Sequence, residues 1–245
     1  MSTKTIPLRV QLLIVFALWW VIWAYRPWNL SDWILENVLT VLAVSFLIAT
    51  RNRFRLSNVS YVLIFVFMCF HTVGTHYTYA DVPYERWTAA LSFSINDLFG
   101  FQRNHFDRLV HFLFGFLLCY PVREVFMRIV QAQGAWSYYL PVELVMSLSM
   151  LYELIEWAVA EVFGGDLGMA YLGTQGDIWD AHKDMALASL GAVLGMLIVA
   201  GINWKYQRDF IAEMRDSLRV KGTVPLGEVK LAEYRRQSED DRPAS

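Results

Sequence analysis

Long apolar segments alternate with short polar segments along most of this chain. Six of the apolar segments approach the length of about 20 residues that an α-helix needs to cross the hydrocarbon core of a bilayer. They cover residues 7–25, 33–50, 58–77, 107–126, 138–162 and 180–203. The second is the least uniform, because Glu36 falls close to its start. The pattern predicts an all-α, polytopic membrane helix bundle of about six transmembrane helices.

The pattern changes near residue 209, where the long apolar runs end and charged residues become frequent. We therefore expect a transmembrane helical domain over residues 1–208 and a charged cytoplasmic tail over residues 209–245. Phe210, Met214 and Leu218 follow a helical spacing, which predicts a short amphipathic helix in the tail. Residues 238–245 are polar, and we expect this end to be disordered.

The composition fits a membrane protein and argues against one class of partner. Of the 245 residues, 56% are hydrophobic and only 18% are charged, a low share for a soluble domain. The ten tryptophans suit the aromatic belts that lie at the level of lipid headgroups. The formal net charge of -2 argues against nucleic-acid binding, which needs a concentrated basic face. Membrane lipids are the expected partners.

Basic residues in the short loops predict the orientation of the helices, because cytoplasmic loops are enriched in Lys and Arg. Such residues precede the first span and follow the second, fourth and sixth spans. They are Lys4, Arg9, Arg51, Arg53, Arg55, Arg123, Arg128, Lys205 and Arg208. With six spans, all of them fall on one side of the membrane. Both termini are therefore expected in the cytoplasm.

Acidic and histidine residues gather at the opposite, outer ends of four spans. An ionisable side chain in the membrane costs several kcal/mol unless it is paired or ligated, so it is a functional candidate by default. The candidates are His71, Asp107, His111, Glu153, Glu156, Asp177, Asp180 and Asp184. Helices that present these groups at a similar depth would enclose one polar cavity in the outer half of the membrane.

Helical spacing places the acidic candidates on shared faces. Asp107 and His111 are four residues apart, so their side chains stack on one side of the helix. Glu153 and Glu156 are three residues apart and meet the same condition. The three aspartates at 177, 180 and 184 form one stripe if the last span begins that early.

The same spacing excludes two of the other histidines. His182 falls on nearly the opposite side of its helix from Asp184. His71 and His76 are five residues apart, which is about 140° around an ideal helix, so both cannot face one site without a break. His71 is the better candidate, because it lies deeper in its span.

Carboxylates this close together repel one another, and a bound cation is the simplest remedy. Imidazole together with carboxylate suits zinc, iron or manganese. The predicted ligands of such a divalent metal are His71, Asp107, His111, Glu156, Asp177 and Asp180. Glu153 and Asp184 are the predicted catalytic groups, because a metal-activated water needs a general base.

Some of these residues also have a structural interpretation. Asp107 lies between Arg103 and Arg108, so it suits helix capping and surface ion pairs. Asp177 and Asp180 suit capping of the last span and complement its dipole. Four residues resist this interpretation, because they lie a turn or more inside apolar sequence: His111, Glu153, Glu156 and Asp184.

Four short motifs resemble one family of bacterial membrane proteins. They are HTVGTHYTY at 71–79, RNHFDR at 103–108, YELIEW at 152–157 and LGTQGDIWD at 172–180. Together they resemble the YjdF-like family, over roughly residues 10–205. The resemblance implies a multi-pass protein of the bacterial inner membrane. It carries no catalytic assignment, so the predicted site rests on the residues alone.

Three functions are compatible with this pattern. The leading hypothesis is a metal-dependent hydrolase that acts on a lipid or a lipid-linked substrate at the outer leaflet. The alternative is a proton- or cation-coupled transporter, whose site would lie near the bilayer midplane between repeated halves. The chain shows no clear internal repeat and few polar groups in its inner half, which favours the enzyme. In a third interpretation the protein is a scaffold whose polar groups only hold the helices together.

Overall fold

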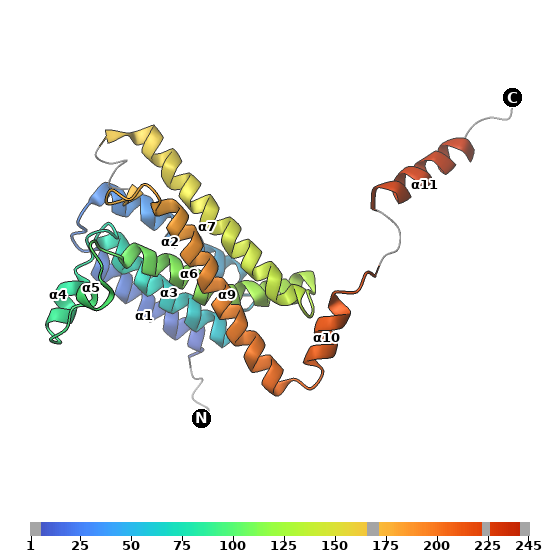
Figure 1. Ribbon diagram of the computed structural model, residues 1–245, viewed down its shortest axis with the longest axis horizontal. Helices are drawn as coiled ribbons and strands as arrows, with labels where there is room; N and C mark the ends of the chain where they lie inside the picture. The colour runs from blue at the N-terminus through green and yellow to red at the C-terminus, as the bar shows by residue number, and fades with distance from the viewer. Residues whose placement is uncertain (1–5, 166–171, 222–225, 241–245) are drawn as a thin grey trace.

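Six long helices form the body of the protein in the computed structural model, which describes residues 6–165, 172–221 and 226–240 (Figure 1). The helices are α1 (Leu8–Ala24), α2 (Leu30–Thr50), α3 (Asn58–His76), α6 (Phe106–Val125), α7 (Trp136–Phe163) and α9 (Asp180–Tyr206). They occupy the six predicted spans to within a few residues. The described residues contain no strand, so the all-α class is confirmed.

Four of these helices are long and apolar enough to cross a membrane by length and composition alone. They are α2, α3, α9 and α6 together with its π-helical extension, η1 (Phe126–Val130). The apolar helix α1 has 17 residues, and α7 has 28 residues but carries four glutamates. A bundle of about six membrane helices follows.

Side-chain caps fix where α2 and α3 begin. The Asn29 side chain accepts hydrogen bonds from the backbone N–H groups of Ser31 and Asp32 at the start of α2. The Ser57 hydroxyl accepts from the Ser60 N–H at the start of α3. The Glu124 carboxylate, on α6, accepts from the Ser57 N–H and the Ser60 hydroxyl, which joins this end of α3 to α6. Caps of this kind satisfy N–H groups that have no partner within the helix.

Helices α6 and α9 approach so closely that glycines are required between them. A Cβ added at Gly115 of α6 would collide with the Ala188 carbonyl of α9. In the other direction, a Cβ added at Gly191 would collide with the Phe112 carbonyl. Membrane helices gain stability from such backbone contact, because lipid offers no hydrophobic drive for helix association.

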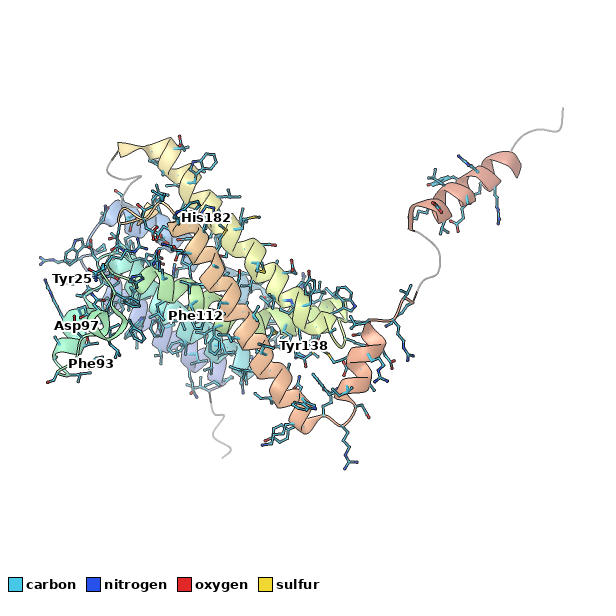
Figure 2. The ribbon with its side chains drawn as sticks, in the orientation of Figure 1. Tyr25, Phe93, Asp97, Phe112, Tyr138 and His182 are labelled. Carbon is cyan, nitrogen blue, oxygen red and sulfur yellow. The ribbon has the colours of Figure 1, made fainter. Side chains whose placement is uncertain are left out.

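The connecting segments and the tail add shorter helices. Helices α4 (Tyr84–Ala89) and α5 (Ile95–Phe99) lie outside the bundle, in the segment that carries Phe93 and Asp97 in Figure 2. The tail forms α10 (Phe210–Ser217), in the range predicted to be an amphipathic helix, and α11 (Leu226–Asp240). Helix α11 ends at Asp240, residues 241–245 lie outside the described part of the chain, and the disorder expected for residues 238–245 stays a prediction.

Helix α10 contacts the start of α7. The Glu213 carboxylate accepts from the Gly134 N–H at 3.0 Å, and the Ser217 hydroxyl accepts from the Ala135 N–H at 2.9 Å. The indole of Trp136 donates to the Ser217 carbonyl at 2.9 Å. These bonds hold the first part of the tail against the bundle, while the division into two domains at residue 208 stays a prediction.

Two alanine substitutions on α9 test the α6–α9 contact. We expect Gly191→Ala to lower the free energy of unfolding by about 1–3 kcal/mol, because the added methyl group overpacks a filled interface. Gly201→Ala is the matched control, since a Cβ there has nothing within 4 Å. Thermal unfolding in detergent, followed by tryptophan fluorescence, measures both variants. Equal melting temperatures for the two would contradict the close contact.

Candidate metal centre

Buried acidic and histidine side chains converge at one end of the bundle. Because successive long helices run in opposite directions, this end joins the C-termini of α1, α3 and α7 to the N-termini of α2, α6 and α9 (Figure 1). We call it the acidic end. Its buried ionisable residues are Asp32, Glu36, His71, His111, Glu153, Asp180 and Asp184.

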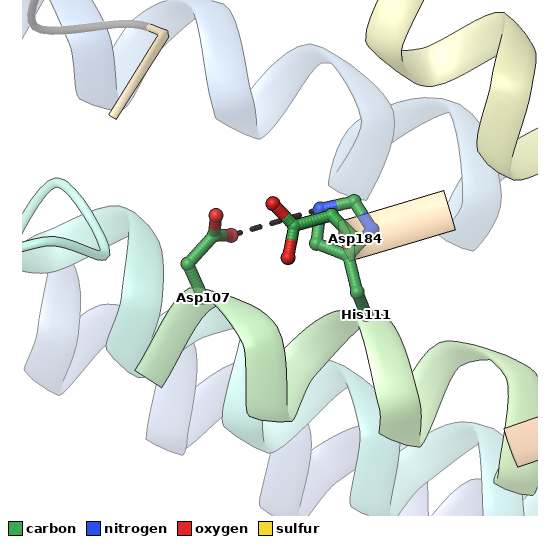
Figure 3. Close-up of side chains that lie close together, drawn as sticks. All are labelled: Asp107, His111 and Asp184. Carbon is green, nitrogen blue, oxygen red and sulfur yellow. Dashed lines mark ion pairs between the residues drawn. The ribbon is translucent and has the colours of Figure 1, made fainter. Parts of the chain in front are cut away.

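The closest group at the acidic end consists of Asp107, His111 and Asp184 (Figure 3). One candidate ligand atom from each residue lies within 4.8 Å of the others. Asp107 and His111 come from successive turns of α6, as the four-residue spacing predicted. Asp184 comes from α9 and is only 2% exposed. The glycine contact between α6 and α9 brings this carboxylate across to the other two side chains.

Several polar atoms around this group have no hydrogen-bond partner among the described residues. His111 Nε2 lies 3.7 Å from Asp107 Oδ1 and 3.5 Å from Glu153 Oε1, which is long for a hydrogen bond. Asp184 Oδ1 and Glu153 Oε1 are buried without a partner. A buried carboxylate oxygen is costly in this state unless a cation or a donor reaches it. The arrangement therefore suits a cation between the three side chains.

Asp177 and Asp180 already have cationic partners. Arg108 Nη2 donates to Asp177 Oδ2 at 2.6 Å and to Asp180 Oδ1 at 3.1 Å. The Arg103 guanidinium also donates to Asp180, and Lys183 Nζ donates to Asp177 Oδ2 at 2.5 Å. These pairs connect the start of α6 to the start of α9. Their geometry agrees with the structural interpretation of the two aspartates better than with a role as metal ligands.

His71 has a neighbour at each ring nitrogen. Its Nε2 lies 3.0 Å from the Thr40 hydroxyl of α2, and its Nδ1 lies 2.5 Å from the Tyr79 hydroxyl. His76 Nδ1 instead lies 2.7 Å from the Trp23 carbonyl. The two histidines thus have different surroundings, as their spacing predicted, and neither belongs to the closest group.

The two predicted residues of α7, Glu153 and Glu156, lie beside the closest group. Glu153 is buried and its Oε1 lies 3.5 Å from His111 Nε2, and Glu156, three residues further along α7, is half-buried. His182 is exposed on α9, where its ring contacts Trp179 (Figure 2). Its exclusion from the predicted site agrees with this position.

Helix α2 also contributes acidic side chains to the acidic end, which the sequence pattern did not predict. Asp32 and Glu36 are each 2% exposed, and they line a small cavity, of about 10 Å³, at the acidic end. The other lining residues are Thr78, Tyr79, Asp107, Glu156, Leu172 and Gly173. The Tyr152 hydroxyl donates to the Glu36 carboxylate at 3.0 Å. A signal was present, because Asp32 and Glu36 are four residues apart at the outer end of a predicted span.

Comparison with known proteins identifies the family. Residues 7–205 match the family model described as "Predicted membrane protein (DUF2238)". The chain belongs to the DUF2238 family. It is 34% identical to the inner membrane protein YjdF of Escherichia coli (strain K12) over 179 residues, which are 73% of this chain and 82% of that protein. No solved structure matches the chain.

The DUF2238 match and the identity with YjdF confirm the family resemblance, and together with the apolar helices they support a multi-pass location in the inner membrane. The matched range contains all six long helices except the last residue of α9, and it contains every residue of the acidic end. Helices α10 and α11 lie beyond it. The candidate site thus lies within the range that matches the DUF2238 family model, whereas the tail lies outside that range.

The ion pairs of Asp177 predict how stability depends on pH. Asp177 lies in the segment before α9, and its pKa is well below the usual value because Lys183, the Trp179 N–H and Arg108 all donate to the carboxylate. A lowered pKa means that the stabilisation is complete above the unfolded value of about 4 and is lost as the pH falls below it. We expect Asp177→Asn to lower the melting temperature at pH 7 and to matter progressively less below pH 4.

Thermal unfolding at several pH values measures this effect. Asp97→Asn, at an exposed position of α5, is the control and should leave the wild-type pH profile unchanged. A difference between wild type and Asp177→Asn that stays constant from pH 7 to pH 3 would contradict the role of the ionised carboxylate.

Proposed function

We propose that this protein is a metal-dependent membrane hydrolase that acts on a lipid or lipid-linked substrate at the outer leaflet. The observation that carries the proposal is the group of Asp107, His111 and Asp184, whose ligand atoms lie within 4.8 Å of one another. The unpartnered oxygen of Asp184 supports it, because a bound cation would offset the cost of burying that atom. This ligand set keeps Asp107 and His111 from the six predicted ligands and adds Asp184, which the sequence analysis assigned as a catalytic group.

The chemistry of the group favours a transition metal. One imidazole and two carboxylates suit zinc, iron or manganese better than magnesium or calcium, which prefer oxygen ligands alone. Three protein ligands also leave a coordination position for water, as in catalytic zinc sites. A metal-bound water is acidic enough to act as a nucleophile near neutral pH. Glu153, whose Oε1 lies 3.5 Å from His111 Nε2, would act as the general base that accepts a proton from such a water.

The distribution of charge supports an outer-leaflet location for the acidic end. Arg51, Arg53 and Arg128 lie at the opposite end of the bundle, where few acidic residues accompany them. Basic loops stay in the cytoplasm, so the acidic end faces outward in this proposal and both termini are cytoplasmic. A substrate from the outer leaflet would then reach the metal without crossing the bilayer.

A proton- or cation-coupled transporter is the second proposal, and a scaffold is the third. Carboxylates on α2, α6, α7 and α9 are compatible with transport of a cation. The enzyme is preferred because the acidic groups gather at one end of the helices, whereas transporter sites usually lie at the midplane. Cation-coupled uptake into proteoliposomes would favour the transporter.

Metal analysis of the detergent-purified protein tests the centre. We expect close to one zinc, iron or manganese ion per chain, and a loss of affinity of at least about ten-fold in His111→Ala, because even outer partners of metal ligands contribute that much. His182→Ala is the matched control, since this exposed histidine lies outside the group. Folded wild-type protein that binds none of these metals would refute the proposal.

A second variant separates chemistry from metal binding. We expect Glu153→Gln to retain the metal and to lose about 100-fold or more of the hydrolytic rate, as is typical when a general base is removed. Incubation of the protein with a bacterial polar lipid extract, followed by mass spectrometry of the products, measures the rate. Unchanged turnover in this variant would exclude Glu153 as the base.

A further inference from the structure

The small cavity beside the candidate metal centre has carboxylates on half of its lining residues. Four of its lining residues are acidic and none is basic: Asp32, Glu36, Asp107 and Glu156. They come from three helices, α2, α6 and α7. The nearby arginines, Arg103 and Arg108, are engaged by Asp177 and Asp180 instead. A positively charged group is therefore the ligand that this cavity would attract.

Asp32 provides a second, independent observation at this cavity. It is 2% exposed, and its Oδ2 atom has no hydrogen-bond partner among the described residues. The cap at Asn29 involves the backbone N–H of Asp32 and supplies no donor to Oδ2. Because a buried carboxylate is costly without a positive partner, its position in the cavity wall points to a cationic occupant.

The size of the cavity restricts that occupant. A volume of about 10 Å³ holds roughly one water molecule. A primary ammonium group is close to this size and has three donors, which suit carboxylates arriving from several directions. A trimethylammonium group or a sugar ring is too large. A phosphate is too large as well and would be repelled by the acidic lining.

We propose that the cavity binds the primary ammonium group of an aminolipid headgroup, so that the lipid substrate is an amine-bearing one. This inference rests on the proposed function and names its substrate class. Asp107 lines the cavity and also belongs to the candidate metal group, so an ammonium held there lies next to the metal position. The hydrolysed bond would then lie in the headgroup region of the lipid, away from the ends of the acyl chains.

Native mass spectrometry of the detergent-purified protein with defined lipids tests this site. The lipids are phosphatidylethanolamine, phosphatidylcholine and phosphatidylglycerol, which differ in the headgroup. We expect wild type to retain phosphatidylethanolamine about ten-fold better than the other two, since hydrogen bonds to charged groups are worth about that factor. Asp32→Asn should lose the preference, while Asp97→Asn, at an exposed position, should keep it. Glu36→Gln replaces Asp32→Asn if the latter does not fold.

The outcomes separate this inference from the proposed function. Equal retention of the three lipids by wild type would overturn the ammonium site, whatever the metal content. Loss of a second metal ion in Asp32→Asn would also overturn it, because the cavity would then be a metal site. Preference for phosphatidylethanolamine that persists in His111→Ala would support it. The same preference in a wild-type protein that binds no metal would support the ammonium site and refute the hydrolase.

Discussion

The close contact between α6 and α9 is the interaction on which the acidic end depends. Gly115 and Gly191 let the two backbones touch, and the starts of both helices then lie side by side. Asp184 reaches Asp107 and His111 only because of this approach. The arginines at 103 and 108 tie the same two helix starts together through Asp177 and Asp180. Backbone packing thus sets the distances, and the ion pairs hold the ends in register.

These ion pairs also divide the acidic residues into two sets with different roles. Asp177 and Asp180 have arginine or lysine partners, so their negative charge is balanced within the chain. Asp184 and Asp32 each keep a buried oxygen that no described residue satisfies. Arg103 and Arg108 form their ion pairs with the first set. A cation bound beside the second set would balance its charge.

The long helices could be predicted from the sequence because hydrophobic length is a local property. The pairing of Asp107 with His111 was predictable for the same reason, since it depends only on helical spacing. The partners of Asp177 and Asp180 were not, because Arg108 lies some 70 positions away in the chain and only the α6–α9 contact joins them. Asp32 lies just before the second predicted span, which starts at residue 33, although α2 begins earlier, at Leu30. Glu36 lies inside that span, where it counts only as an interruption of the apolar pattern.

The opposite end of the bundle shows how this protein treats a carboxylate that has only a structural role. Glu124 accepts hydrogen bonds from the Ser57 N–H, the Ser60 hydroxyl and Arg128, so both of its oxygens have donors. A scaffold would gain stability by treating Asp184 and Asp32 in the same way, with one serine or asparagine on a neighbouring helix. At the acidic end, Asp184 Oδ1 and Asp32 Oδ2 have no such donor among the described residues. Several carboxylates there surround a cavity of about 10 Å³. Buried acceptors left without donors reduce stability. A ligand that supplies positive charge, as proposed for this site, would satisfy these acceptors.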